Sequence, residues 1–326
     1  MEKIKHNQKE NLILANAVIV LEANELNKLK EFYRPYLLEK VPQGGLFSAK
    51  TPACVITAYK SGKVLFQGGG SEAEALKWGN ASAKSAPAKK TGKSSTGLPP
   101  QISSMSAIGS DEVGTGDFFG PITVVAAYVR KEDIPLLKEL GVKDSKDLND
   151  VKIIEIARQI KDIVPHSLIP LHNEKYNQLQ QSGMSQGKMK AILHNKAILN
   201  VLDKIAPTKP EAILIDQFVE AESYYRHLKG QKVIAKENVY FSTKAEGIHL
   251  AVAAASILAR YAFVQYFEKL SSSAGFTIPK GAGAQVDVAA AKLIMAKGKD
   301  VLPKFVKLHF ANTGKAMNLV NKKKGI

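Results

Sequence analysis

Two adjacent acids lie in the stretch Ile108-Gly109-Ser110-Asp111-Glu112-Val113-Gly114-Thr115-Gly116-Asp117-Phe118-Phe119-Gly120-Pro121. A short apolar segment precedes them, and a second apolar run follows at residues 122–129. This pattern predicts that Asp111 and Glu112 lie at the end of a β-strand. Adjacent strand residues point to opposite faces, so two carboxylates share one site only where the strand ends or bends, which the following glycines allow. Paired carboxylates suit hard cations. Because the net charge of +16 attracts polyanions, we expect metal-assisted phosphodiester chemistry.

Composition places the chain among soluble, packed proteins. Its 326 residues suffice for one large domain or two ordinary ones, and 45% of them are hydrophobic. The N-terminal residues lack a signal-peptide pattern, and the apolar stretch 248–259 is shorter than the roughly 20 residues of a membrane span, so we expect a buried helix there. The single cysteine, Cys54, excludes an intrachain disulfide, and no zinc-site spacing is present. The sequence predicts a cytoplasmic protein that contacts no membrane.

A change in composition divides the chain. Residues 81–104 are rich in Lys, Ser and Ala with little apolar bulk, which is typical of a flexible linker. The lysines there could touch phosphates, but a solvated tether is the simpler interpretation. The linker would separate an N-terminal domain, residues 1–80, from a larger domain, residues 105–326.

Strand and helix signals predict a small α+β module before the linker. We expect a strand over residues 12–21 and a helix from a cap at Asn24 to about residue 38. A hairpin over residues 54–66 and a helix over residues 71–78 would follow.

Basic and aromatic residues are mixed on the predicted hairpin and the strand before it. Lys50, Tyr59 and Lys60 could lie along a nucleic-acid backbone. An ordinary solvated sheet face explains the same residues equally well, so both interpretations stay open.

After the linker, strand-like runs alternate with helical ones, which favours an α/β domain. The runs cover residues 122–129, 151–163, 167–171, 189–205, 212–216 and 248–270. The apolar run 212–216 ends in Asp216, as expected of a buried central strand with a functional residue at its tip. Glu246 precedes the apolar helix at 248–270; alone it would be a capping residue, but with three other acids it could join a site for two ions roughly 4 Å apart.

The glycines after the paired acids do not fit a dinucleotide-binding motif, because the third is one position late and the acids would repel a pyrophosphate. The backbone amides of Gly114, Thr115 and Gly116 could instead approach a ribose 2′-hydroxyl. Four lysines could together bind a phosphate backbone, although each alone is simplest as a solvated charge: Lys143, Lys146, Lys188 and Lys190. Ser145 would add a hydroxyl donor to this group. We interpret His194, Asn195 and His249 as structural.

Several motifs in order make the chain resemble the type 2 ribonucleases H and, among them, the bacterial ribonuclease HIII group. They are the stretch 110–121, Lys143-Asp144-Ser145-Lys146, Asn173-Glu174-Lys175-Tyr176-Asn177, Met189-Lys190-Ala191-Ile192-Leu193-His194-Asn195, Ile215-Asp216-Gln217-Phe218, Ala245-Glu246 with the Ala-rich helix, and Pro279-Lys280-Gly281-Ala282-Gly283. The resemblance implies an RNase H-like domain, with a central mixed sheet flanked by helices, preceded by a small α+β domain similar to the TATA-binding protein. That small domain would bind substrate.

The same resemblance implies hydrolysis of the RNA strand of RNA–DNA hybrids, leaving 5′-phosphate and 3′-hydroxyl ends. It maps catalysis and metal binding onto Asp111, Glu112, Asp216 and Glu246. The implied cofactor is Mg²⁺, for which Mn²⁺ could substitute, and the implied mechanism uses two ions. We expect a monomer without an obligate protein partner, whose partner is the hybrid duplex.

One departure from the wider family affects substrate choice. Many ribonucleases HII carry Gly-Arg-Gly or Gly-Lys-Gly where this chain has Gly114-Thr115-Gly116, so we expect weak cutting at a single ribonucleotide embedded in DNA. In ribonuclease HII the fourth acid is an aspartate that follows the Ala- and Ser-containing helix. The matching stretch here, residues 260–264, contains no acid, which argues against the ribonuclease HII group itself. Two other functions stay open: a non-catalytic hybrid- or RNA-binding protein with a structural ion, and a two-metal nuclease for DNA or structured RNA.

Overall fold

The computed structural model describes residues 16–42, 44–79 and 97–324. These divide into two compact units: the first holds the residues up to 79 together with 135–141, and the second holds the others. The linker expected at residues 81–104 lies mostly outside the described residues, as do the first residues of the strand expected at 12–21. Its described end, from residue 97, contains a short turn, Ile102–Ser104, whose Ile102 is buried in the core of the second unit.

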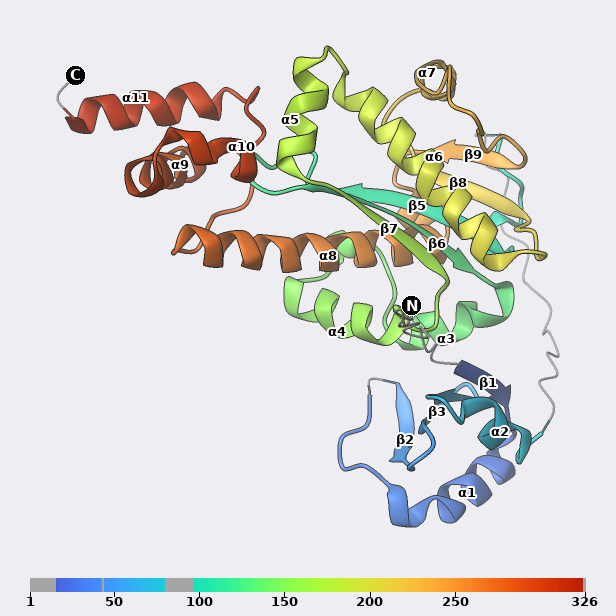
Figure 1. Ribbon diagram of the computed structural model, residues 1–326. Coiled ribbons are helices and arrows are strands. Elements are labelled where there is room, and N and C mark those ends of the chain that lie inside the picture. The colour runs from blue at the N-terminus through green and yellow to red at the C-terminus, as the bar shows by residue number, and fades with distance from the viewer. Residues whose placement is uncertain (1–15, 43, 80–96, 325–326) are drawn as a thin grey trace, which may run out of the picture. The chain divides into compact units, whose positions relative to one another are not determined.

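The part of the first unit up to residue 79 is an antiparallel sheet with two α-helices, as predicted (Figure 1). Along the sheet the strand order is β1-β4-β3-β2. The elements are β1 Asn16–Val20, α1 Ala23–Phe32, β2 Gly45–Lys50, β3 Val55–Tyr59, β4 Lys63–Gln67 and α2 Ser71–Leu76. Apolar residues of one sheet face pack against α1 and α2 in a single cluster. Gly62 has a φ of +84° in the β3–β4 turn, a conformation that favours glycine.

The predicted bounds of α1 are wrong at both ends. The helix is capped by Glu22 and not by Asn24, because the side chain of Glu25 accepts a hydrogen bond from the Glu22 amide (3.0 Å) in a capping box. It ends at Phe32 and not near residue 38; a 3₁₀ turn over Arg34–Tyr36 follows, in which Pro35 has no backbone N–H with which to continue the α-helical hydrogen bonds.

The second unit is built on a mixed sheet in the order β7-β6-β5-β8-β9. β5, β6 and β7 are antiparallel, whereas β5, β8 and β9 are parallel. The strands are β5 Ala107–Val113, β6 Ile122–Val129, β7 His166–Leu171, β8 Ala212–Asp216 and β9 Val239–Ser242. β6 and β8 have the predicted bounds because both are continuous apolar runs buried within the sheet. The short edge strand β9 was not predicted.

Helices cover both faces of this sheet, which confirms the predicted α/β domain (Figure 1). α6 packs on β6 and β7, and α8 packs on β5 and β6 from the opposite side, with α4 against it. The helices of the second unit are α4 Asp150–Ile160, α5 Asn173–Gln181, α6 Gln186–Ile205, α7 Ala221–His227, α8 Leu250–Ala274, α9 Ala284–Lys297, α10 Leu302–Phe305 and α11 Asn312–Lys324, whereas α3 Ile134–Glu139 falls almost wholly in the segment 135–141 of the first unit.

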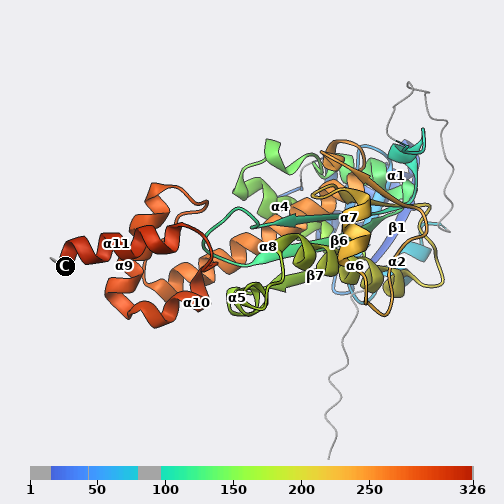
Figure 2. The ribbon, with the colours of Figure 1, turned by 90° about the horizontal axis from the view of Figure 1, so that it is seen from above.

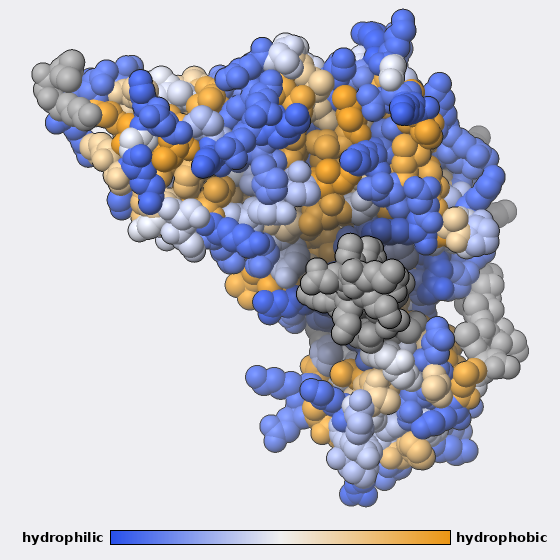
Figure 3. Space-filling model, viewed as in Figure 1, coloured by the Kyte–Doolittle hydropathy of each residue, from blue (hydrophilic) through white to orange (hydrophobic). Residues whose placement is uncertain are grey.

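The apolar helix expected at residues 248–270 is confirmed as a core helix. α8 is long and apolar enough to cross a membrane, but 72% of its apolar window is buried inside the protein. Beyond its far end, α9, α10 and α11 form a helical extension of the second unit (Figure 2). This extension has its own apolar cluster, which also takes in Phe118 and Phe119. On the face drawn in Figure 3, hydrophilic residues cover most of the surface, with hydrophobic residues scattered between them.

Gly109 marks the closest approach of β5 to α8. A Cβ atom at this position would lie 2.1 Å from the backbone nitrogen of Val252 and 2.2 Å from the carbonyl carbon of Ala251. Because neither backbone atom can move without displacing α8, we expect Gly109→Ala to lower the free energy of unfolding by about 3 kcal/mol. Urea denaturation measures the loss. Gly116→Ala is the matched control, because a Cβ there would meet no atom within 4 Å; equal midpoints for the two variants would contradict this packing.

Candidate active site

The predicted acids of the sheet stand where β5 and β8 separate. β5 pairs with β6 along its whole length, but its parallel pairing with β8 ends at Ser110 and Ile215. Asp111 and Asp216 are therefore the first residues beyond the shared pairing on the two strands. The carboxyl edge of the sheet thus brings together acids that lie more than a hundred positions apart in sequence.

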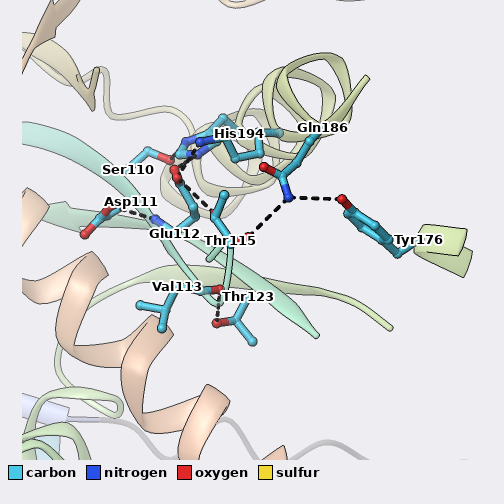
Figure 4. A network of polar contacts seen from close by, with 10 residues as sticks. Ser110, Asp111, Glu112, Val113, Thr115, Thr123, Tyr176, Gln186 and His194 are labelled. Atoms are coloured by element: carbon cyan, nitrogen blue, oxygen red, sulfur yellow. Dashed lines mark hydrogen bonds and ion pairs between the residues drawn. The ribbon is translucent and has the colours of Figure 1, made fainter. Parts of the chain in front are cut away.

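The two adjacent acids do not point the same way. The structure continues β5 through Val113, so Asp111 and Glu112 alternate across the sheet, and their side chains point away from each other (Figure 4). Asp111 faces α8, where Ser256 forms a hydrogen bond with it, whereas Glu112 faces α6. The expectation that the strand ends at the acids holds on the β8 side and is wrong on the β6 side.

Glu112 is held by two basic residues of α6. Lys190 Nζ donates to Oε1 (2.7 Å), and His194 Nε2 lies 2.9 Å from Oε2. The other ring nitrogen of His194, Nδ1, lies 2.6 Å from the Ser110 hydroxyl, which fixes the orientation of the ring. Phe218 lies beneath both bases, with the Lys190 amine 4.1 Å from its ring centroid. Burial alone would raise the pKa of Glu112, but the contacts with His194 and then Lys190 lower it to about 2.

Glu246 is held from another segment. It is buried in the short turn Ala245–Gly247 that precedes α8. The backbone amide of Ser145 donates to its Oε2 (2.9 Å), and Lys146 Nζ lies 3.3 Å from its Oε1. The Ser145 hydroxyl contacts the Ser256 hydroxyl (2.9 Å), which joins this segment to the α8 face of the site.

Asp111 and Asp216 are electrostatically unlike Glu112. Burial, followed by the charge of Glu112, raises the pKa of Asp111 well above its ordinary value, and Asp216 and Glu246 add to the rise. Burial also raises the pKa of Asp216, although the Ala245 amide donates to its carboxylate (2.9 Å) and opposes this. Within the described residues Asp111 has no basic ion-pair partner, and only 5% of its surface is exposed.

The donor chemistry of these acids fits a divalent cation. All four offer only oxygen ligands, and a buried carboxylate without a counter-charge, such as Asp111, is costly unless a cation joins it. In the part of the chain that the structure describes, no three acidic, histidine or cysteine side chains are arranged so that they could hold one ion. Glu112 and Glu246 instead contact protein donors, so a cation would compete with Lys190 and Lys146 for them.

The predicted substrate contacts fall into two groups. Exposed or half-buried are Thr115, Gly116, Lys143, Lys146, Lys188, Lys50 and Lys60. Buried are Gly114, Ser145, Lys190 and Tyr59. Ser145 and Lys190 support acids rather than presenting a free surface, and Tyr59 is 2% exposed, so the expectation of an open Lys-Tyr face on the hairpin is wrong for Tyr59.

Sequence reasoning missed the support that α6 gives to Glu112. Lys190 and His194 are one helical turn apart, a spacing that places both side chains on one face of the helix. This spacing was the available signal. His194, interpreted as structural, in fact contacts a predicted catalytic acid.

Comparison with known proteins assigns both units to families. The family model described as Ribonuclease HII matches residues 108–313, and a domain of unknown function (DUF3378) matches residues 16–91. A ribonuclease HIII of Bacillus mycoides is 58% identical over 95% of this chain and 100% of its own length. A ribonuclease HIII of Bacillus thuringiensis subsp. konkukian is 60% identical over 93% of this chain and 98% of its own. The crystal structure of Bst-RNase HIII in complex with Mn²⁺ is similar with a TM-score of 0.69 and 49% identity, covering 94% of this chain and 100% of that one.

Proposed function

Because the chain belongs to the ribonuclease HII family, as a member of its ribonuclease HIII group, we propose that it hydrolyses the RNA strand of RNA–DNA hybrids at the carboxyl edge of the second unit's sheet. The acids of this site are Asp111, Glu112, Asp216 and Glu246. Products would carry 5′-phosphate and 3′-hydroxyl ends. The protein would act in the cytoplasm as a monomer, without a membrane or an obligate protein partner.

The buried carboxyl group of Asp111 is the observation that carries this proposal. It lies between α8 and the tip of β8 without a basic partner among the described residues, and its burial, followed by the charges of the neighbouring acids, raises its pKa. Mg²⁺ or Mn²⁺, when bound, would supply an activated water and a counter-charge for the leaving 3′-oxygen. Asp111 and Asp216 would be shared ligands of these ions, and Glu112 and Glu246 would complete their shells.

The rest of the site would bind and orient the hybrid. Gly116 is exposed, and a Cβ there would point into open space, so a ribose can approach the backbone of the glycine loop at this point. The exposed lysines Lys143 and Lys146 lie on the segment that holds Glu246, where they could contact phosphates next to the acids. In the first unit, Lys50 and Lys60 would contact the duplex backbone.

Cleavage of a labelled RNA–DNA hybrid in Mg²⁺, Mn²⁺ or EDTA, beside single-stranded RNA, duplex RNA and duplex DNA, tests the function. We expect cation-dependent cutting confined to the RNA strand of the hybrid, with ends that a phosphatase and a polymerase can identify. Binding without cutting in every cation would favour a non-catalytic hybrid-binding protein. Cutting of duplex DNA or duplex RNA at a similar rate would favour a nuclease of another substrate class.

Substrate choice depends on Thr115, which stands where many ribonucleases HII have a basic residue. Its hydroxyl donates to Glu112 (Oγ1 to Oε1, 3.4 Å). Threonine has no positive charge with which to bind a phosphate at the junction between RNA and DNA. We therefore expect a single ribonucleotide embedded in duplex DNA to be cut about 100-fold more slowly than a run of ribonucleotides. Both substrates should be assayed side by side at equal concentration; comparable rates would refute the prediction.

A further inference from the structure

Lys307 is a buried lysine that the proposed chemistry does not use. None of its surface is exposed, although lysine is among the residues least often buried. Its amine donates to the carbonyl oxygens of Asp117 and Gly120, at 2.7 Å each. Its backbone amide donates to the carbonyl oxygen of Phe118 (2.9 Å). One residue thus binds three carbonyls of the glycine loop that joins β5 to β6.

The burial of this amine needs an explanation, because an apolar side chain of similar length would avoid its desolvation. Burial lowers the pKa of Lys307 to about 7, with Asp117 acting in the opposite direction. A neutral amine still carries two hydrogens, and a charged one carries three, so either form satisfies both carbonyls. The hydrogen bonds to the loop, and not a charge pair, therefore account for lysine at this position.

Other segments hold the same loop from its remaining sides. Gln186 Nε2 donates to the Thr115 carbonyl (3.2 Å) and to the Tyr176 hydroxyl (3.0 Å), as Figure 4 shows. The backbone amide of Gly281 donates to the Asp117 carboxylate (2.6 Å). Gly114 and Gly120 have φ values of +95° and +81° and pack against phenylalanine rings of α8. The loop is therefore held in one conformation, and Gly116 is its exposed point.

We propose that Lys307 is a positioning residue for the RNA strand: it holds the glycine loop, residues 114–120, from its buried side, so that the amides of Gly114 to Gly116 keep the orientation in which they meet a ribose. This inference rests on the proposed function. It assigns to the C-terminal helical extension, which carries Lys307, a part in substrate binding although Lys307 itself touches no substrate.

Lys307→Met is the variant that tests the proposal, because methionine retains much of the apolar length and loses both donors. We expect KM for a short hybrid to rise about tenfold with kcat within about threefold, since the loop binds the strand while pairing with β6 holds the acids of β5 in place. The concentration of Mn²⁺ that gives half-maximal activity should not change. Lys304→Met, which removes an exposed lysine three residues earlier, is the matched control and should behave as wild type.

Salt dependence separates a positioning role from a direct phosphate contact. Lys307 is fully buried, so Lys307→Met should keep the wild-type slope of log KM against log salt, whereas loss of a phosphate contact lowers that slope by about 1. A lower slope would overturn the proposal. An unchanged KM together with a lower Tm would also overturn it, because Lys307 would then serve stability alone.

Hydrogen exchange tests, independently of cleavage, whether Lys307 holds the glycine loop. In Lys307→Gln, which keeps a shorter donor, the amides of Phe118 and Gly120 should exchange faster than in wild type, while those of β6 remain protected. Unchanged exchange, or global unfolding of both variants, would reject the positioning role. Failure of the wild-type protein to cut hybrids would instead reject the proposed function and leave the exchange result to be judged separately.

Discussion

Replacing Asp111 with asparagine is expected to abolish cleavage and, in the absence of divalent cations, to raise the melting temperature. The substitution keeps the shape of the side chain and removes a charge that is buried beside three other acids. Loss of one shared ligand should lower kcat by about 10³-fold or more. Stability should increase because the carboxylate that repels Glu112 is gone. Activity and stability would thus change in opposite directions at one residue.

The pH dependence of Asp111 has a definite sign. A carboxyl group whose pKa is raised on folding binds its proton more tightly in the folded protein, so its destabilising contribution is absent below the unfolded pKa and grows as pH rises towards the folded pKa. Asp216 contributes in the same direction. In EDTA, the gain in melting temperature from Asp111→Asn should therefore be larger at neutral pH than at pH near 4.

Thermal unfolding of wild type and Asp111→Asn in EDTA and in Mn²⁺ measures both effects. The cation should stabilise the wild type, because it binds only the folded site, and should stabilise the variant much less. Asp300→Asn, an exposed acid far along the chain, is the control and should change neither turnover nor the response to the cation. Near-normal turnover in Asp111→Asn, or a lower melting temperature in EDTA, would remove Asp111 from the centre of the site.

The sequence was sufficient for the inner strands of the sheet and for naming the candidate acids, because both depend on local pattern, whereas the short edge strand β9 was missed. β6 and β8 are continuous apolar runs, and a strand buried on both faces has that pattern whatever its neighbours are. Asp216 could be placed at the tip of β8 because it directly follows such a run. Asp111, Glu112 and Glu246 were likewise chosen from the acid pair before a glycine turn and from the acid before an apolar helix, and the family motifs pointed to the same four residues.

The direction and partners of side chains could not be predicted in the same way, because they depend on contacts between distant segments. Lys190 was expected on the substrate surface, but α6 turns it towards Glu112 and the ring of Phe218. Lys307 lies among apolar residues in the sequence, where nothing local indicates that two loop carbonyls, almost two hundred positions away, lie within reach of its amine. Tyr59 lies at the end of β3, as the predicted hairpin requires, but its side chain is buried and not on the expected binding face.

Glu112→Gln should also abolish cleavage, but with the opposite effect on stability from Asp111→Asn. Lys190 and His194 would remain buried, with 10% and 0% of their side chains exposed, opposite a neutral amide that cannot accept from both. The pKa of Glu112 is lowered to about 2, so the free energy of unfolding should fall by as much as about 3 kcal/mol at neutral pH.

The pH dependence again follows from the direction of the shift. A carboxyl group whose pKa is lowered on folding stabilises the protein above its unfolded pKa, and this contribution is lost as pH falls through the folded value, about 2 here. The difference in unfolding free energy between wild type and Glu112→Gln should therefore be full at pH 7, begin to shrink below the ordinary pKa of a glutamate, and be small near pH 2. Urea denaturation at several pH values provides the measurement.

A second substitution distinguishes a broken ion pair from a general loss of packing. In the double variant Glu112→Gln, Lys190→Met the buried amine is gone together with its partner, so much of the lost stability should return, whereas Lys190→Met alone should be destabilising. Additive losses in the double variant would show that Lys190 and Glu112 are not coupled. If they are coupled, the two neighbouring acids are maintained in different ways. Glu112 is kept ionised by bases of α6, whereas Asp111 has no basic partner among the described residues, and we expect a divalent cation to balance its charge.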